Sequence, residues 1–464
     1  MRLHWWDEAF PAAGLPIEEM SFSRQVSMEL SFSRQASGDA SKERAPAAVV
    51  RVERALSGEL LAEVALQVSS PVASLRAAAA EAAGVGPLQV ELLHCSTPLA
   101  ESAFQGLTHG SVVQALLRPA GALVLTASVD GTAKLWRISD GACICTFAGH
   151  DFQVMAASFS PDGKEIVTAS LDGTARIWQV EDTSCLHTLD GQDYQVVSAA
   201  FSPDGKQVVT APLDNTAKIW SSKEGSCQRA LMGHRDVVLS AKFSPHGSLV
   251  ATRSLDGTAK LWCAKTGKCL QTLSCRGGEA KLVVFSPDGT MLLTSGEHHQ
   301  IAKLWKHAWP EASGDVYQPC GALLGHVSEV TAGNFSSDGW LAVTASADCT
   351  ARIWHTCTEN DRCMHTLHGH TAEVKCAIFS PDASVVATAS CDSTARLWSV
   401  EDGSCLHCLA HSAEVSCAAL SPDGESLLTA SADSSARLWR VEDGELLQCL
   451  EGHDGAVTSA IFSP

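Results

Sequence analysis

Histidine, serine and aspartate recur together along this chain, and they are the three residue types of a hydrolase catalytic triad. One such set is His150, Ser170 and Asp172. In a triad, the histidine takes the proton of the serine hydroxyl while the aspartate orients the histidine. An enzyme needs this arrangement at one site, whereas the chain holds five comparable sets. Repetition therefore argues against catalysis, and we expect no enzyme.

Cysteine and histidine also occur with spacings that suggest a metal clip. His355-x-Cys357 faces Cys363-x-His365 across a predicted hairpin, and these are ligand types that zinc prefers. Similar Cys-x-His pairs recur elsewhere in the chain without a second pair opposite them. The recurrence favours a structural origin for the motif, so we expect neither a metal nor a cofactor.

The remaining cysteines follow the same logic. Cys405 and Cys408 form a CxxC motif on a predicted strand, away from the helix start that would lower a thiol pKa. The chain has 18 cysteines, which in a reducing compartment behave as small hydrophobic residues. Four of them lie 42 residues apart and follow a structural repeat: Cys143, Cys185, Cys227 and Cys269.

Charge and composition exclude several classes of function. The chain has 33 Lys and Arg against 52 Asp and Glu, a net charge of −19 that disfavours nucleic acids and anionic membranes as partners. No apolar run approaches the roughly 18 residues of a membrane span, and the N-terminus carries acids instead of an apolar signal core. We expect a soluble protein of the cytoplasm, with the nucleus as an alternative.

The elements that position these residues form a repeat. Eight tryptophans recur at intervals of 41 to 49 residues: 136, 178, 220, 262, 305, 354, 398 and 439. One unit contains the strand-like stretches VMAASF, EIVTAS, TARIW and SCLHTL, separated in part by the turns SPDG and LDGT. A period in the forties with four short strands is typical of propeller blades.

These units resemble the WD-repeat (WD40) family over residues 118–464. The resemblance rests on the recurring Gly-His, Ser-x-Asp-Gly-Thr and strand-terminal Trp positions, although no Trp is followed by Asp. It implies a mainly β fold, a β-propeller, and a scaffold that binds proteins or peptides. In this family a buried network ties each blade together, and an unpaired buried polar group would cost about 1–3 kcal/mol.

The resemblance assigns that network to five blades. Its members are His150, Ser170, Asp172 and Trp178; His234, Ser254, Asp256 and Trp262; His326, Ser346, Asp348 and Trp354; His370, Ser390, Asp392 and Trp398; and His411, Ser431, Asp433 and Trp439. The third blade has Gln192 and Pro212 at the histidine and serine positions. The fifth has Arg276 at the histidine position, and the sequence GEHHQ (296–300) replaces its turn, so we predict that these two blades are the least stable.

Ring closure depends on the end of the chain. Residues 111–117 (SVVQALL) fit both an inner blade strand and the last strand of a preceding domain. Residues 456–462 offer a second inner strand, which would close an eight-bladed ring and bring His453 to Ser128, Asp130 and Trp136. An end within the motif also fits a chain cut short, with further blades to follow.

Residues 48–117 differ from the repeats. Two strands around Ser57-Gly58, an alanine-rich helix from Pro71 to Gly84, and two further strands resemble a ubiquitin-like β-grasp domain. The apolar recognition patch of ubiquitin corresponds to Leu56, Leu93 and Leu116, which are ordinary leucines on the alternative interpretation.

Residues 1–47 are predicted to be a flexible tail. They contain SFSRQVS and SFSRQAS, in which Ser27 and Ser37 resemble sites of basophilic kinases. A plain polar linker explains the same composition.

The face that carries the His loops and Asp turns is the predicted binding surface. Its acidic arc comprises Glu279, Glu329, Glu373 and Glu414. Its apolar arc comprises Val129, Met155, Leu171, Val197, Leu213, Val237, Leu239 and Leu255. Such a pair of arcs fits a partner with apolar and basic residues, whereas drift among repeats would leave both arcs unused. A longer loop with Trp309 and Tyr317 is a second candidate contact.

The sequence therefore predicts a non-enzymatic scaffold that binds a protein or peptide on its propeller face. The alternative is a substrate receptor in a ubiquitin–proteasome pathway, with the β-grasp leucines docking to its machinery. Neither the partner nor the oligomeric state follows from the sequence.

Overall fold

The computed structural model describes residues 122–191, 194–275, 279–295, 300–307, 317–357 and 363–464, and the backbone of six strands between residues 24 and 117. Two compact units divide the chain, one built mainly from residues 122–464 and one mainly from residues 15–121. Within the residues so described, no helix has the length and apolar character that a membrane span requires.

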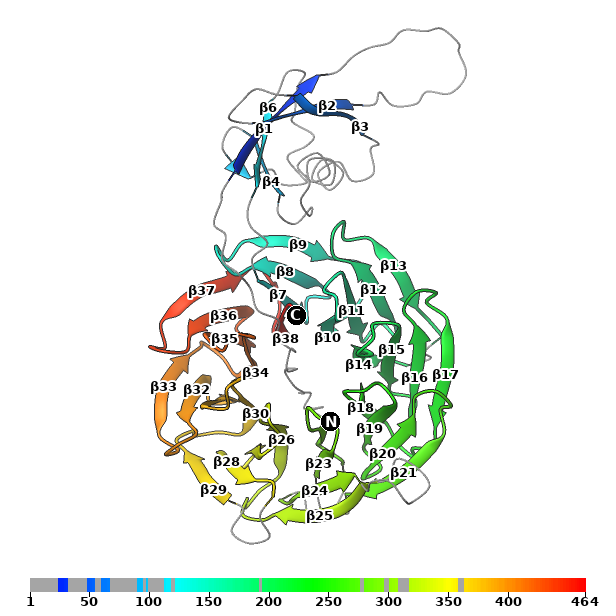
Figure 1. Ribbon diagram of the computed structural model, residues 1–464, viewed down its shortest axis with the longest axis vertical. Helices are drawn as coiled ribbons and strands as arrows, with labels where there is room; N and C mark the ends of the chain where they lie inside the picture. The colour runs from blue at the N-terminus through cyan, green and yellow to red at the C-terminus, as the bar shows by residue number, and fades with distance from the viewer. Residues whose placement is uncertain are drawn as a thin grey trace. The chain divides into compact units, whose positions relative to one another are not determined.

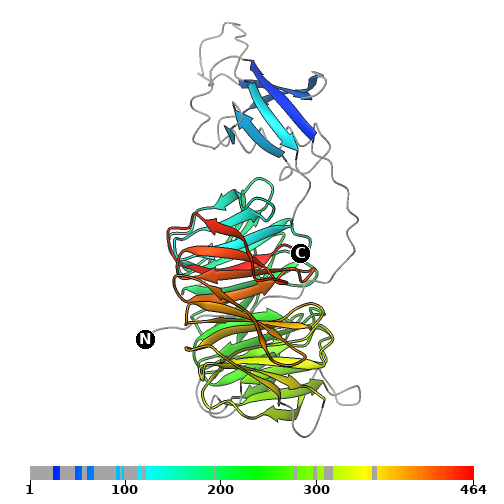
Figure 2. The same ribbon diagram turned by 90° about the vertical axis from the view of Figure 1, so that its left-hand side faces the viewer.

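The larger unit is a closed ring of eight four-stranded antiparallel sheets (Figure 1). Blade one is β38-β7-β8-β9, and blades two to eight follow in order from β10-β11-β12-β13 to β34-β35-β36-β37. Seen edge-on, the strands run across the thickness of a disc (Figure 2). The structure therefore confirms the predicted eight-bladed propeller.

Each blade runs from an innermost to an outermost strand (Figure 1). The innermost strands are β38 (Val457–Phe462), β10 (Val154–Phe159), β14 (Val196–Phe201), β18 (Val238–Phe243), β22 (Val283–Phe285), β26 (Val330–Phe335), β30 (Val374–Phe379) and β34 (Val415–Leu420). The second strands are β7 (Leu123–Ser128), β11 (Glu165–Ser170), β15 (Gln207–Pro212), β19 (Leu249–Ser254), β23 (Met291–Ser295), β27 (Leu341–Ser346), β31 (Val385–Ser390) and β35 (Ser426–Ser431).

The outer half of each blade is equally regular. The third strands are β8 (Ala133–Arg137), β12 (Ala175–Gln179), β16 (Thr216–Ser221), β20 (Thr258–Cys263), β24 (Ala302–His307), β28 (Thr350–His355), β32 (Thr394–Ser399) and β36 (Ser435–Arg440). The outermost strands are β9 (Cys143–Phe147), β13 (Cys185–Leu189), β17 (Cys227–Met232), β21 (Cys269–Ser274), β25 (Tyr317–Leu323), β29 (Cys363–His368), β33 (Cys405–Ala410) and β37 (Leu446–Glu451).

The hydrophobic core lies between neighbouring blades. One cluster joins Ile219 of blade three to Trp262 of blade four, and another joins Leu438 of blade eight to Trp136 of blade one. Each of these tryptophans buries a large apolar surface against the preceding blade. The repeated Trp thus holds adjacent sheets face to face.

Blade one is completed by the C-terminal strand. β38 pairs antiparallel with β7, with Val457 opposite Ser128 and Phe462 opposite Val124. This pairing confirms the predicted closure of the ring. It also removes the exposed sheet edge that β7 would otherwise present.

The smaller unit contains a six-stranded sheet in the order β3-β2-β1-β6-β4-β5. Its strands are β1 (Arg24–Ser31), β2 (Ala48–Arg54), β3 (Leu60–Leu66), β4 (Val90–His94), β5 (Thr97–Pro98) and β6 (Val112–Leu117). The predicted strands of residues 48–117 coincide with β2, β3, β4 and β6, so SVVQALL belongs to this sheet. The sequence did not predict β1, which falls within the expected tail and lies between β2 and β6. The helix expected at 71–84 lies outside the described residues, and the likeness to ubiquitin stays a prediction.

Candidate functional site

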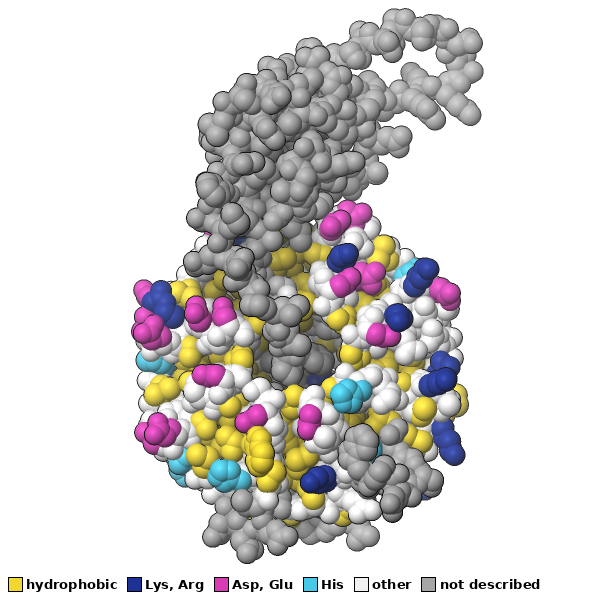
Figure 3. All heavy atoms as spheres, viewed as in Figure 1, with side chains coloured by type: hydrophobic (Ala, Val, Ile, Leu, Met, Phe, Trp, Pro, Cys, Tyr) yellow, Lys and Arg dark blue, Asp and Glu magenta, His cyan; other side chains and the backbone are white. Residues whose placement is uncertain are grey.

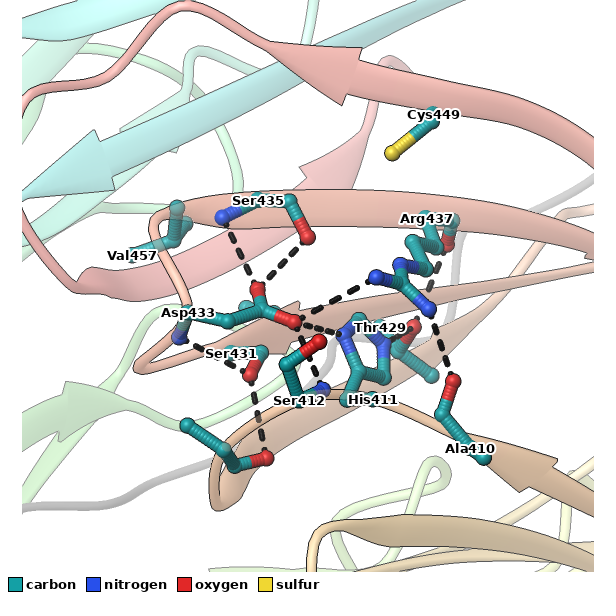
Figure 4. Close-up of polar contacts among 12 residues, drawn as sticks. Ala410, His411, Ser412, Thr429, Ser431, Asp433, Ser435, Arg437, Cys449 and Val457 are labelled. Carbon is teal, nitrogen blue, oxygen red and sulfur yellow. Dashed lines mark hydrogen bonds and ion pairs between the residues drawn. The ribbon is translucent and has the colours of Figure 1, made fainter.

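A chain of hydrogen bonds joins three parts of blade eight. The indole Nε1–H of Trp439 in β36 donates to Thr429 Oγ1 in β35 at 2.9 Å. Thr429 Oγ1 lies 2.8 Å from Nε2 of His411, in the loop before β34. His411 Nδ1 lies 3.1 Å from Asp433 Oδ2 in the turn between β35 and β36 (Figure 4). The loop, the turn and two strands are thereby connected.

The same geometry recurs around the ring. Among the residues that the structure describes, six such His–Asp contacts span 2.7 to 3.1 Å: His150–Asp172, His234–Asp256, His326–Asp348, His370–Asp392, His411–Asp433 and His453–Asp130. The last of these joins the two ends of the ring, as predicted for a closed blade one. It carries a 2.7 Å contact from His453 Nε2 to Thr126, which in turn accepts the Trp136 indole N–H.

The serines belong to the network through the backbone of the aspartate turn, and they do not link histidine to tryptophan. Ser431 Oγ accepts the backbone N–H of Asp433 at 3.1 Å (Figure 4). It also donates to the Glu414 carbonyl at 3.0 Å. It holds the turn in place. The serines that accept the corresponding aspartate N–H in the other blades are Ser128, Ser170, Ser254, Ser346 and Ser390.

A threonine links the histidine to the tryptophan instead, because its hydroxyl, in the second strand of the blade, faces both the indole and the imidazole. The threonines that accept the tryptophan N–H are Thr126, Thr168, Thr210, Thr252, Thr294, Thr344, Thr388 and Thr429. Sequence reasoning missed them, although a threonine stands two residues before the Ser or Pro position in seven repeats.

The six paired histidines favour the neutral form. Burial lowers their pKa below 6.5, although the neighbouring aspartate acts in the opposite direction. Burial raises the pKa of Asp256 and Asp392, but hydrogen bonds from the turn and from histidine outweigh it and lower each to about 2. A neutral imidazole donates from Nδ1 to the carboxylate and accepts the threonine O–H at Nε2.

This arrangement stabilises blades and does not assemble a catalytic triad. A nucleophile must be hydrogen-bonded to its base, whereas these serines bond to the backbone and these histidines bond to buried threonines. We therefore interpret the six sets as structural ties.

The link between tryptophan and threonine is present in blades three and five as well. Trp220 donates to Thr210 and Trp305 donates to Thr294, each at 2.9 Å. In blade three, Asp214 forms an ion pair with Lys218 at 3.2 Å. Gln192, Arg276 and residues 296–299 lie outside the described residues.

The acidic arc is less negative than its four glutamates suggest. Lys281 forms an ion pair with Glu329, and Lys375 Nζ lies 3.3 Å from Glu373 Oε2. The Lys375 side chain is only 5% exposed, so this positive charge is held within the ring. Glu279 is half-buried, while Glu414 is exposed.

Part of the predicted apolar arc is core. Val197 and Leu239 are 5% and 4% exposed, and Leu171 and Leu213 pack against the cluster that contains Val197. Met155, Val129, Val237 and Leu255 are half-buried.

The burial has a physical reason, because Val197 and Leu239 occupy a position that joins neighbouring innermost strands. In blades six and one, the residue at that position donates its hydroxyl to the next blade: Thr331 to the Val374 carbonyl, and Thr458 to the Val154 carbonyl. An aliphatic side chain there fills the same junction by packing. The predicted contrast between arcs therefore reflects blade-to-blade contacts in part.

Two aromatic side chains on the histidine loops were missed. Phe152 and Tyr194 are 64% and 58% exposed, and each follows a histidine position of the repeat by two residues. At the corresponding position other blades carry Asp236, Ser328, Ala372, Ala413 or Gly455. The sequence could have indicated them, because two aromatic residues occupy the same loop position in adjacent blades. The loop bearing Phe152 lies on the Asp-turn face, because the neighbouring Asp151 N–H donates to Asp172.

The Cys-x-His pairs have a structural role. His365 Nε2 lies 3.1 Å from the Glu401 carbonyl, and His407 Nε2 lies 3.1 Å from the Glu442 carbonyl. Each histidine thus joins an outermost strand to a turn of the next blade. Among the residues that the structure describes, no group of three or more His, Cys, Asp or Glu side chains is placed to hold a metal ion.

Other predicted contact residues fall into two groups. Tyr317 is 2% exposed and donates its hydroxyl to the Gly289 carbonyl at 2.6 Å, so it belongs to the core of blade five and not to a contact loop. Trp309, Leu56 and Ser37 lie outside the described residues, and the side chains of Leu93, Leu116 and Ser27 do as well.

Comparison with known families identifies the repeats. The model of the family "WD domain, G-beta repeat" matches seven segments: 104–137, 141–179, 183–221, 225–263, 317–355, 361–399 and 403–440. Between 263 and 317, where blade five begins and departs from the pattern, there is no match. No curated protein matches the chain.

The first matched segment and the structure divide blade one differently. The segment 104–137 takes in Val112–Leu117, which pairs with β1 and β4 of the smaller sheet. The innermost place of blade one is filled by β38 from the other end of the chain. The first repeat matched in the sequence and the first blade of the structure therefore begin with different strands.

Proposed function

Since the chain belongs to the WD domain, G-beta repeat family, we propose that it is a non-enzymatic scaffold that binds a protein or peptide on its His-loop face. Propellers of this family are typical protein-interaction scaffolds. The observation that carries the proposal is the exposure of Phe152 and Tyr194 at equivalent positions of adjacent blades. Large exposed aromatic side chains are the commonest anchors of protein interfaces.

The charges around the aromatic pair suggest the partner's chemistry. Asp151 is exposed directly beside Phe152, and Glu414 is exposed on a histidine loop of blade eight. A partner with an apolar or aromatic anchor between basic residues would bury the aromatic pair under its anchor. Its basic residues would lie close to the exposed acids. Because Lys281 and Lys375 neutralise two glutamates, we assign the main contribution to the aromatic anchor and a smaller one to charge.

Selection of displayed peptides on the full-length chain tests the proposal. Binding of the selected peptides is then measured by titration calorimetry with the chain and with Phe152→Ser/Tyr194→Ser. We expect apolar and basic residues in the peptides, and a loss of affinity of about tenfold or more in the variant.

The matched control is Leu186→Ser/Leu406→Ser. These leucines are 40% and 44% exposed but lie in the outermost strands β13 and β33. The control should bind the peptides as the unmodified chain does. Equal binding by the Phe152/Tyr194 variant would place the site elsewhere, and a failure to select any peptide would contradict the proposed surface.

A further inference from the structure

Charge is distributed unevenly around the ring. Blade four, residues 233–275, holds six Lys or Arg and two Asp or Glu. Blade eight, residues 411–451, holds two Lys or Arg and eight Asp or Glu. In a ring of eight, blade four lies opposite blade eight and blade three lies opposite blade seven. Blade four is therefore basic and blade eight acidic, despite the negative net charge of the chain.

The contrast is sharpest in the turn between the third and fourth strands. We call Lys223 of blade three and Lys265 and Lys268 of blade four the basic edge; all three are exposed. The exposed Glu224 follows Lys223 in the same turn, so Lys265 and Lys268 of blade four carry most of the positive charge of this edge. We call the corresponding acids of blades seven and eight the acidic edge, which comprises Glu401, Asp402, Glu442, Asp443 and Glu445. In Figure 3, Lys and Arg gather along the side that carries β17 and β21, and Asp and Glu along the side that carries β33 and β37.

Most of these charges are available for contact. In the described part of the chain, no carboxylate forms an ion pair with the three lysines of the basic edge. On the acidic edge, Arg440 neutralises part of the charge of Asp443 and Glu445, with contacts of 2.7 Å to each. Glu401, Asp402 and Glu442 remain exposed at the rim.

The repeat places both edges at the same height of the disc. They occupy the same turn of their blades and are separated by half a revolution. A copy of the ring displaced sideways in its own plane would bring its acidic edge against the basic edge of the first. Blade three would then face blade eight, and blade four would face blade seven.

We propose that the propeller binds a second copy of this chain edge to edge, with the basic edge of one copy against the acidic edge of the next. The contact is heterologous and leaves one edge free on each copy, so it leads to rows instead of a closed dimer. Exposed ion pairs are individually weak and are screened within about 10 Å at about 0.1 M salt. The association is therefore weak and favoured by low ionic strength. It uses a surface distinct from the proposed peptide-binding face.

Sedimentation velocity of the full chain at about 20 mM and about 500 mM salt tests this proposal. At low salt, the weight-average sedimentation coefficient should rise with protein concentration, and at high salt it should not. Lys223→Glu/Lys265→Glu/Lys268→Glu should weaken association about tenfold or more, and Glu401→Lys/Asp402→Lys/Glu442→Lys should do the same. Circular dichroism checks that both variants fold.

A mixture of the two variants separates edge pairing from general charge effects. Each variant alone has two edges of like charge, whereas the mixture pairs opposite edges and should associate again. The control Lys164→Glu/Arg235→Glu/Lys306→Glu changes the net charge equally at exposed positions outside the basic edge and should associate as the unmodified chain does. Concentration-independent sedimentation of the unmodified chain at low salt, or a mixture that stays monomeric, would overturn the proposal.

Discussion

At the scale of single residues, one threonine hydroxyl satisfies two buried partners. Thr429 is fully buried, accepts the Trp439 indole N–H, and lies within hydrogen-bond distance of His411. Apolar substitution would leave a donor and an acceptor without partners in a region that water does not reach. The threonine hydroxyl is thus the central group of the tie.

Thr429→Val should therefore destabilise the propeller by about 1–3 kcal/mol, whereas Thr429→Ser, which keeps the hydroxyl, should cost less. Chemical denaturation followed by tryptophan fluorescence measures both. If valine were tolerated as well as serine, the hydroxyl would not be what holds the blade.

The site residues were predictable only where the repeat itself marked them. His411 and Asp433 stand out because their spacing recurs, and the structure brings them together. Val197 was assigned to the surface because the sequence does not show that its position in the innermost strand faces the next blade. Phe152 was missed because exposure depends on how a loop leaves the sheet, which no local pattern specifies.

At the scale of elements, the blades are alike in strand order but unequal in their ties. β22 has three residues, whereas β10 and β30 have six. Blade three has Pro212 at the serine position and Gln192 at the histidine position. The number of blades and the closing strand were predictable because strand-like segments could be counted. The strand β1 was not, because its duplicated, serine-rich sequence is typical of a polar tail and does not show which strands it pairs with.

Amide hydrogen exchange should distinguish these blades. We expect amides of β14–β17 and β22–β25 to exchange before those of blades two and seven, with protection lower by roughly tenfold or more. Exchange monitored by mass spectrometry of peptic fragments measures it. Uniform protection in all eight blades would show that the missing histidines do not limit local stability.

At the scale of the whole molecule, six neutral histidines make stability depend on pH. Their folded-state pKa lies below 6.5, so as the pH falls through this value the unfolded chain binds protons that the folded chain does not. The contribution of these histidines to the free energy of unfolding is complete above the histidine pKa of the unfolded chain, and it is lost as the pH falls. Because the six contributions add, the effect belongs to the ring and not to one blade.

The free energy of unfolding should thus fall between about pH 7 and about pH 5, with an uptake of up to six protons. Denaturation curves at several pH values give the slope. His411→Gln, which copies the residue type of blade three, should make the slope shallower by up to one proton. A stability independent of pH in this range would contradict the neutral assignment.

Closure by β38 has a consequence for the kinetics of folding. Leu123 and Ser463 are hydrogen-bonded although they lie 340 positions apart, whereas the hairpins within blades two to eight join near neighbours. The entropy of closing so long a loop makes this pairing slow, and the seven other blades are expected to form first. The intermediate then presents β7 as an open edge to any β38 nearby. Closure within one chain does not depend on concentration, but exchange between chains does, so concentrated refolding should shift product toward strand-swapped oligomers.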